Sequence, residues 1–449
     1  MADDHVSGEG LRVAIGFPSA VMLVMGGMVG VGVFVNPAVV ARQLHSPELI
    51  VAAWSLGGVV ALLGALVYGE LAARFPHTGG EYVYLREAYG PVVGFLFGWT
   101  TLLVVQAGGM AAVAIVFAKN LDVVLGRDIP QNLIVVGVLA GLAAVNALGV
   151  RTGNGVQGWL GLLKIAVIVA LVGAGLFFAP AAPAPTVPPA PTLDLLKTFG
   201  AAMIAVVFSY GGWQTSNYVA GEIKDPGRNL ARALVVGVLG VIVLYLAVNI
   251  ACLRALGVPA LAATLTPTSD VLAKVAGPLG ARLAAGAIGL SAIAFLSQST
   301  LTGPRVYFAM ARDGLFFRQV ARIAESSRVP VIAIVLQAVW TSLLALTGSY
   351  EQILSYVIAM NFLFFGLAAA SLFIFRRRER RSGAAPPQYL APGHPWTTGL
   401  FVLASVLVVA ASFWSFPINS LIGYAIMLAG VPAYLFWRRQ NARAISAQP

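Results

Sequence analysis

The sequence predicts an all-α membrane protein that crosses the bilayer many times. Charged residues make up only 10% of its 449 residues and hydrophobic residues 59%, whereas soluble domains carry about a quarter charged residues. Mean hydropathy is +0.86. Unbroken apolar runs such as 133–148 lack the alternating polarity of the strands in a membrane β-barrel. We therefore exclude both a soluble protein and a β-barrel.

Apolar runs of about 20 residues span a bilayer as a helix, and the chain contains twelve of them. The predicted spans are 14–42, 49–74, 90–119, 131–149, 155–179, 196–222, 230–254, 280–310, 329–347, 351–375, 398–416 and 418–438. The interpretation that follows is a polytopic protein with short connections.

The basic residues predict the orientation of these spans. Twenty of the 28 Lys and Arg residues fall in connections on one side, including the run RRRERR at 376–381, and only seven on the other. Basic connections stay in the cytoplasm, so we expect both termini inside. The opening MADDHVSGEG lacks the basic region of a signal peptide. These features predict a multi-pass protein of the inner (cytoplasmic) membrane.

A proline-rich stretch, APAAPAPTVPPAPT, cannot continue a helix and predicts a stiff extracytoplasmic linker. It separates two sets of five spans, and an odd number per set gives the halves opposite orientations, as in inverted repeats. The expected organisation is a cytoplasmic tail (1–13), a first five-helix repeat (14–179), the linker (180–195), a second inverted repeat (196–375), a basic cytoplasmic loop (376–397), helices eleven and twelve (398–438) and a cytoplasmic tail (439–449).

The first span of each half is interrupted by glycine near its middle. GGMVGVGVF occupies 26–34, and FSYGGW occupies 208–213. Glycine weakens a helix by about 1 kcal/mol relative to alanine, and lipid cannot satisfy the amides and carbonyls that a break exposes. An amino acid could satisfy them, with its carboxylate at amides and its ammonium at carbonyls. The alternative is that these glycines only permit close helix packing.

Four segments together resemble the amino acid, polyamine and organocation (APC) transporter superfamily, in particular bacterial amino acid permeases related to the light-subunit L-type exchangers. They are GVGVF in the first span, GELAARFPHTGGEYVYLREAYG at 69–90, FSYGGWQTSNYVAGEIKDPGRNLARA at 208–233 and RVYFAMARDG at 305–314. The resemblance covers nearly the whole chain. It implies a five-plus-five inverted repeat with two added helices, alternating access, and substrate bound between broken helices one and six.

The resemblance assigns the carboxylate-binding turn to the first break. It falls on Val31 and Gly32, with Gly30 beside them and Gly27 and Met28 just before. Val31 stands where the family pattern has Ser or Ala. A hydroxyl contact to the carboxylate is therefore missing, and backbone amides must bind this group.

At the second break, the resemblance implies that Phe208 is an aromatic gate over the substrate. Ser209 and Gly211 offer carbonyls for the ammonium, and Gln214 falls where related exchangers place a polar neighbour of the substrate. Ordinary packing is the alternative for Phe208.

Lys164 places one basic group inside the apolar fifth span, where it costs about 3 kcal/mol unless paired or neutral. The resemblance implies that its ammonium replaces a sodium ion between helices one and eight, near Gly27, Ser299 and Thr302. Release of its proton would permit proton coupling. The alternative is a lysine whose flexible stem reaches the cytoplasmic surface.

Other charges cluster at the predicted inner helix ends, where we favour solvated loop charges over gating ion pairs. They are Glu70, Glu81, Glu222, Lys224, Asp225, Arg228, Arg305 and Asp313.

The leading hypothesis is a secondary active, sodium-independent transporter of neutral amino acids, acting as a proton symporter or an exchanger. A polyamine or cationic amino acid transporter and a non-transporting sensor on the same scaffold are the alternatives. We expect no enzyme: the four histidines fall in or beside loops, and neither HExxH nor GxSxG occurs. No catalytic residues, metal site, cofactor or nucleic-acid partner is expected. Amino acid, protons and the lipid bilayer are the expected partners, and the oligomeric state stays open.

Overall fold

The computed structural model describes residues 7–8, 10–127, 129–182, 192–347, 350–415 and 417–446. In this part of the chain the secondary structure is helical apart from isolated bridge positions, one pair of which joins Ile15 to Ile223. The predicted all-α class is therefore confirmed. Most of the linker predicted at 180–195 lies outside the described residues.

The first half of the chain holds the helices up to residue 178. They are α1 (Phe17–Met28), α2 (Gly32–Gln43), α3 (Pro47–Arg74), α4 (Glu81–Tyr89), α5 (Pro91–Thr100), α6 (Gln106–Leu125), α7 (Gln131–Ala147) and α8 (Val150–Gly173). Short π-helical segments, η1 (Thr101–Val105) and η2 (Ala174–Phe178), join α5 to α6 and extend α8.

The second half begins with α9. It holds α9 (Thr192–Ser209), the 3-10 segment η3 (Trp213–Glu222), α10 (Pro226–Ala263), α11 (Pro267–Thr302), α12 (Pro304–Arg312), the 3-10 turn η4 (Arg318–Ala321), α13 (Val331–Thr347) and α14 (Tyr350–Ser382). Three further helices follow: α15 (Trp396–Ser415), α16 (Pro417–Leu428) and α17 (Gly430–Ser446).

Every predicted span has a helix at its position. In the described residues, eight helices are long and apolar enough to cross a membrane, and the bent pair α1 and α2 adds a ninth. The apolar helices α7 and α13 are shorter, with 17 residues each. The chain is a multi-pass membrane protein.

Two spans extend further than the sequence predicted. α10 and α11 were expected over 230–254 and 280–310, but they reach Ala263 and start at Pro267. Each contains a sharp turn at a glycine with positive φ, +71° at Gly257 and +57° at Gly277. Glycine adopts this conformation without steric cost. The short helix lies after the turn in α10 (258–263) and before it in α11 (267–275), and neither is long enough to form a spanning apolar run.

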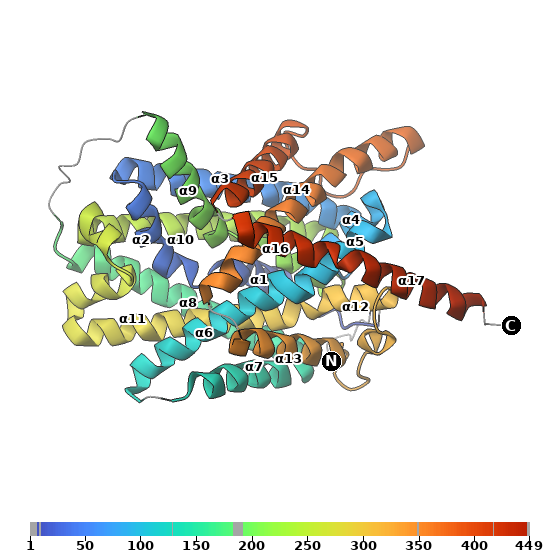
Figure 1. Ribbon diagram of the computed structural model, residues 1–449, viewed down its shortest axis with the longest axis horizontal. Helices are drawn as coiled ribbons and strands as arrows, with labels where there is room; N and C mark the ends of the chain where they lie inside the picture. The colour runs from blue at the N-terminus through green and yellow to red at the C-terminus, as the bar shows by residue number, and fades with distance from the viewer. Residues whose placement is uncertain are drawn as a thin grey trace.

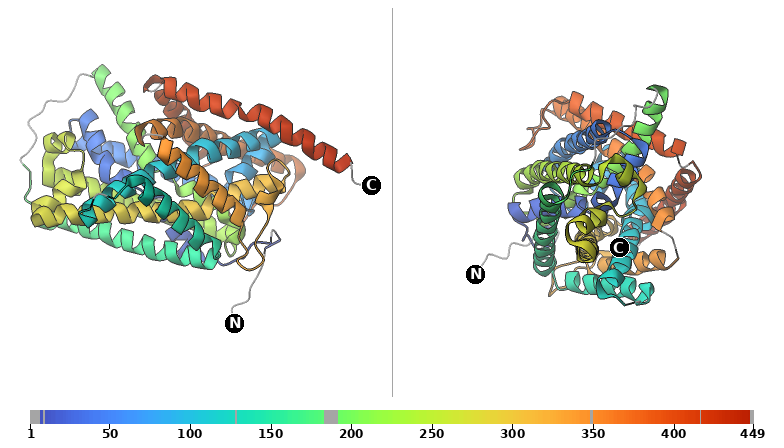
Figure 2. Two further views of the ribbon diagram at one scale, coloured as in Figure 1. Left: turned by 60° about the horizontal axis from the view of Figure 1, so that its bottom comes forward. Right: turned by 90° about the vertical axis from the view of Figure 1, so that its left-hand side faces the viewer.

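The broken helix α1 lies inside the bundle. It packs against α8, α10, α11 and η3, while α2 packs against α9 and α10. Around them α3 lies along α10, and α6 lies along α11 (Figure 1). The last three helices pack on α14, α3 and α5 and occupy the rim of the bundle in the view along its long axis (Figure 2). The first break therefore lies at the centre of the molecule.

Buried charges join the helices at the end of the bundle that carries α4 and α12, which we call the α4 end (Figure 1). Glu222 and Arg305 form a fully buried ion pair, with Nε to Oε1 at 2.7 Å and Nη2 to Oε2 at 3.0 Å. Glu70 is also fully buried and pairs with Arg74 and Arg376. Glu81 is buried too. The interpretation of these charges as solvated is wrong for Glu70, Glu81, Glu222 and Arg305, because the neighbouring helices enclose them.

The ion pair of Glu222 and Arg305 yields a stability prediction. Replacing Glu222 with Gln leaves the guanidinium buried without a counter-charge, which costs about 3–5 kcal/mol. We expect a lower midpoint of thermal unfolding in detergent for Glu222→Gln. Glu87→Gln, at an exposed pair with Arg86, should stay close to the unchanged protein. Equal midpoints of thermal unfolding for the two variants would contradict a buried ion pair between Glu222 and Arg305.

Candidate functional site

The first break separates α1 from α2. α1 ends at Met28, α2 begins at Gly32, and the two axes differ by 43°. Within the break, the amide of Gly30 donates to the carbonyl of Met28 at 2.8 Å. The first amides of α2 have no partner within their own helix, and the positive end of the helix dipole lies there. This turn can therefore bind an anionic group.

The second break separates α9 from η3. α9 ends at Ser209, and the chain turns through Gly211 and Gly212, whose φ is +104°. The amide of Gly212 donates to Oε1 of Gln214 at 3.0 Å, and the amide of Gly211 donates to the carbonyl of Phe208 at 3.1 Å. The carbonyl end of α9 therefore points into the middle of the bundle and can accept from a cation.

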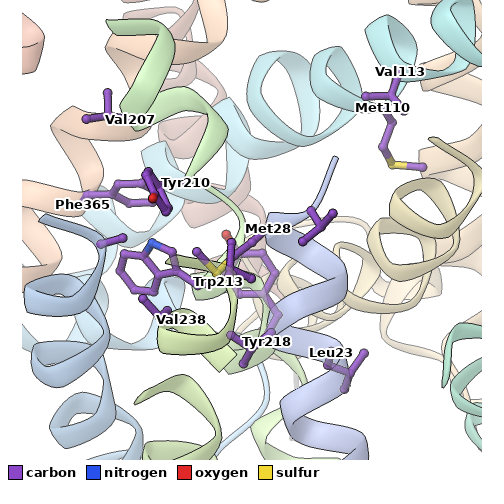
Figure 3. Close-up of a cluster of buried hydrophobic side chains, with 14 of the residues drawn as sticks. Leu23, Met28, Met110, Val113, Val207, Tyr210, Trp213, Tyr218, Val238 and Phe365 are labelled. Atoms are coloured by element: carbon purple, nitrogen blue, oxygen red, sulfur yellow. The ribbon is translucent and has the colours of Figure 1, made fainter. Parts of the chain in front are cut away.

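The two breaks touch each other through their backbones. A Cβ added to Gly212 would lie 2.1 Å from the carbonyl oxygen of Gly27, and one added to Gly27 would lie 2.6 Å from the carbonyl oxygen of Gly212. Close packing and helix breaking are thus joint functions of these glycines, not alternatives. Figure 3 shows the side chains around this contact, with Met28 beside Trp213 and Tyr218.

Tyr245 of α10 holds both breaks. Its hydroxyl lies 2.8 Å from the carbonyl oxygen of Met28 and 3.0 Å from that of Ser209. On the other side, Gln298 of α11 donates to Oγ1 of Thr215 at 2.7 Å, and Thr215 donates to the carbonyl of Gly212 at 2.7 Å. Neither Tyr245 nor Gln298 is among the residues predicted from the sequence. An isolated glutamine in an apolar span was the available signal, whereas Tyr245 resembles any membrane aromatic.

A cavity of about 100 Å³ lies between the breaks. Its lining includes all nine residues that the sequence analysis assigned to the substrate: Gly27, Met28, Gly30, Val31, Gly32, Phe208, Ser209, Gly211 and Gln214. It also includes residues that the sequence analysis did not name, among them Gln106 and Val113 of α6, Phe295 of α11 and Asn361 of α14. No lining residue in the described part of the chain is ionisable.

Lys164 lies beside the first break and is almost fully buried, with 1% of its surface exposed. Its ammonium donates to the carbonyls of Gly26 at 3.1 Å and Val29 at 2.5 Å. A lysine stem that reaches the membrane surface is therefore excluded. The ammonium occupies the carbonyl end of α1, where a cation is favoured by the helix dipole.

The partner of these carbonyls on α11, the eighth predicted span, is Ser291, not the expected Ser299 or Thr302. The Ser291 hydroxyl lies 3.2 Å from the carbonyl oxygens of Val29 and Gly30. Ser299 Oγ instead donates to Gln298 Oε1, and Thr302 Oγ1 donates to the Gln298 carbonyl. Sequence reasoning found the helix but not the residue, because the helical register relative to α1 depends on tertiary packing.

The described residues contain no group of three or more His, Cys, Asp and Glu side chains that could hold a metal ion. The chemistry available at the breaks is hydrogen bonding and charge complementarity.

Comparisons with known proteins match the sequence of this chain to one family. A family model described as amino acid permease matches residues 15–435. The chain is 30% identical to the serine/threonine exchanger SteT of Bacillus subtilis, over 98% of this chain and 100% of the relative. It is 28% identical to the human large neutral amino acids transporter small subunit 2, over 96% of this chain and 82% of the relative. It is 26% identical to the human b(0,+)-type amino acid transporter 1, over 91% and 84%.

The contact between the breaks predicts that Gly212 tolerates no side chain. Gly212→Ala would combine a positive φ with a Cβ that overlaps the Gly27 carbonyl, and we expect a loss of roughly 2–5 kcal/mol. Gly200→Ala on α9 is the control, because a Cβ there meets nothing within 4 Å. Thermal unfolding in detergent compares the two variants. An unchanged midpoint for Gly212→Ala would show that the breaks are not in contact.

Proposed function

The chain belongs to the amino acid permease family, and from that premise we propose that it exchanges neutral amino acids across the cytoplasmic membrane by alternating access. The observation that carries the proposal is the cavity between two broken helices, which presents amides on one side and carbonyls on the other. A free amino acid has one carboxylate and one ammonium at a fixed separation. These are the groups that the two helix ends complement.

The substrate carboxylate binds at the start of α2. The amides of Gly32 and Val33 and the positive dipole end of the helix receive it. Because Val31 carries no hydroxyl, these backbone groups provide the recognition. The ammonium binds at carbonyls near the end of α9, around Ser209 and Gly211, and Phe208 covers the substrate.

The substrate side chain is uncharged. The cavity lining in the described residues contains no carboxylate to balance a lysine or arginine side chain and no cation to balance an acidic one. An unbalanced charge in a site enclosed by protein is costly. Phe295, Val113 and the amides of Gln106 and Asn361 suit apolar or uncharged polar side chains. This chemistry agrees with the relatives, whose names specify serine, threonine or large neutral amino acids.

Sodium is not required, because the ammonium of Lys164 already occupies the carbonyls at the end of α1. A bound sodium ion at those oxygens would face the like charge of the lysine. Exchange is favoured over net uptake because SteT, which this chain matches over the relative's whole length, is named an exchanger. The basic loops further support an orientation with both termini in the cytoplasm.

The experiment is uptake of a labelled amino acid panel into proteoliposomes that are empty or preloaded with unlabelled amino acid. It is repeated with a proton gradient, a sodium gradient, or neither. The proposal expects uptake of neutral amino acids only into preloaded vesicles and independent of sodium. Accumulation in empty vesicles driven by protons would indicate a symporter. Absence of uptake for every amino acid would reject transport and favour a sensor.

Gly32→Val should impair recognition of the carboxylate. A Cβ at Gly32 already lies 3.0 Å from Ser209 Oγ and 3.2 Å from Asn36 Nδ2, so a branched side chain crowds the turn. We expect amino acid affinity to fall about tenfold or more, equivalent to about 1.4 kcal/mol, in a scintillation proximity assay. Gly158→Val on α8 is the control, since a Cβ there has open space. Normal affinity in Gly32→Val would place the substrate elsewhere.

Lys164→Ala should abolish or uncouple transport, because the carbonyls of Gly26 and Val29 lose the ammonium that they share beside the first break. Lys197→Ala removes an exposed lysine and serves as the control. Exchange rate and its dependence on pH are measured for both variants in proteoliposomes. If Lys164→Ala matches the unchanged protein in rate and pH dependence, the cation role is wrong.

A further inference from the structure

A carboxylic acid lies buried at the α4 end without a counter-charge. Glu81 is the first residue of α4 and is fully buried. Tyr68 of α3 donates to its Oε1 at 2.6 Å, and Tyr218 of η3 donates to its Oε2 at 2.9 Å. The carboxyl of Glu81 therefore connects α3, which precedes the linker at 180–195, to η3, which follows it. An opening of this end that moves α3 and α4 away from η3 breaks this contact.

The groups that face Glu81 from the surrounding elements are phenols. Besides Tyr68 and Tyr218, Tyr84 of α4 lies close and donates to Oδ1 of Asn217 at 3.1 Å, and Tyr307 of α12 neighbours Tyr218.

The basic residues near this end contact other acids. Arg305 pairs with Glu222, and Arg86 pairs with Asp313 and Glu87. Among the described residues, no ion pair to Glu81 is present. Its charge, when ionised, is balanced by two hydroxyl dipoles and by the positive end of the short helix α4, without a basic side chain among the described residues.

Burial raises the pKa of Glu81 to about 7 from its ordinary 4.5, although the two phenol hydrogen bonds partly oppose the rise. The carboxyl lies outside the helices identified as spans. Opening of the α4 end would admit water and break the phenol contacts, so the pKa would return toward 4.5. The closed form then binds a proton more tightly than the open form.

We propose that Glu81 is a proton-binding site that couples opening of the α4 end to proton release. The proton leaves the carboxyl for the water on that side when the end opens, and the carboxyl takes up a proton when the end closes. In this step the carboxylic acid of Glu81 (COOH) becomes a carboxylate (COO⁻) and one proton (H⁺), so that atoms and charge balance. This inference rests on the proposed exchange function, because opening of this end is a step of alternating access.

The sign of the pH effect follows from linkage. Since the closed form has the higher pKa, falling pH favours closure across the window from about 7 down to about 4.5. Above about 7 the preference disappears, because both forms are ionised. Exchange limited by opening should therefore slow as the pH falls through this window.

The test measures amino acid exchange in preloaded proteoliposomes at equal pH on both sides, from 8 to 5, so that no gradient contributes. The unchanged protein should slow by about twentyfold between pH 7.5 and 5.5. Glu81→Gln, a neutral mimic of the protonated acid, should be slow and independent of pH. Glu87→Gln changes an exposed acid on the same helix and should keep the original profile.

Tyr218→Phe is a second variant, and it should change a quantity that a purely structural role of Glu81 would leave unchanged. It removes one donor to the carboxylate and should shift the midpoint of the profile to higher pH. Infrared difference spectra between the unchanged protein and Glu81→Gln, taken at pH 6, should show a protonated carboxyl band, and this measurement does not require transport.

Three outcomes overturn the proposal while leaving exchange intact. The exchange rate of the unchanged protein does not depend on pH, the pH profile of Glu81→Gln equals that of the unchanged protein, or the infrared spectra lack the protonated carboxyl band. If Glu81→Gln does not fold, an unshifted midpoint in Tyr218→Phe overturns it equally. Absence of exchange by the unchanged protein at every pH would instead reject the proposed function itself.

Discussion

The architecture depends on contact between two helix breaks at the backbone of Gly27 and Gly212. Each glycine lies where a Cβ would overlap the carbonyl oxygen of the other, so the two broken helices meet without intervening side chains. This approach brings the start of α2 and the end of α9 to one cavity. Helix ends of opposite polarity, held this close, form a site for a molecule that carries both charges.

Breaking a helix inside a membrane leaves backbone groups that must find hydrogen-bond partners. Side chains of α8, α10 and η3 provide such partners. Tyr245 serves the carbonyls of Met28 and Ser209, Lys164 serves those of Gly26 and Val29, and Thr215 serves that of Gly212. These contacts fix the breaks while the first amides of α2 remain available to a ligand. At the α4 end, buried ion pairs and the phenol contacts of Glu81 close the bundle.

The glycine clusters and the lysine in an apolar span were visible in the sequence because each violates a local rule for membrane helices. These violations mark the two breaks and Lys164 in the chain, and the resemblance to the amino acid permeases then assigned the nine cavity residues around the breaks. The roles of Ser291, Tyr245 and Glu81 could not be predicted in this way, since they depend on which helix faces meet. Glu81 follows two glycines and looks like a loop residue, yet α3 and η3 enclose it. The turns at Gly257 and Gly277 escaped detection because their helices are too short to produce a spanning apolar run.

The most direct test of the central claim is a cryo-electron microscopy structure with the amino acid that exchanges fastest. The account predicts ligand density between the breaks, with the carboxylate at the amides of Gly32 and Val33 and the ammonium at carbonyls near the end of α9. A reversed ligand, or density outside this cavity, would contradict it.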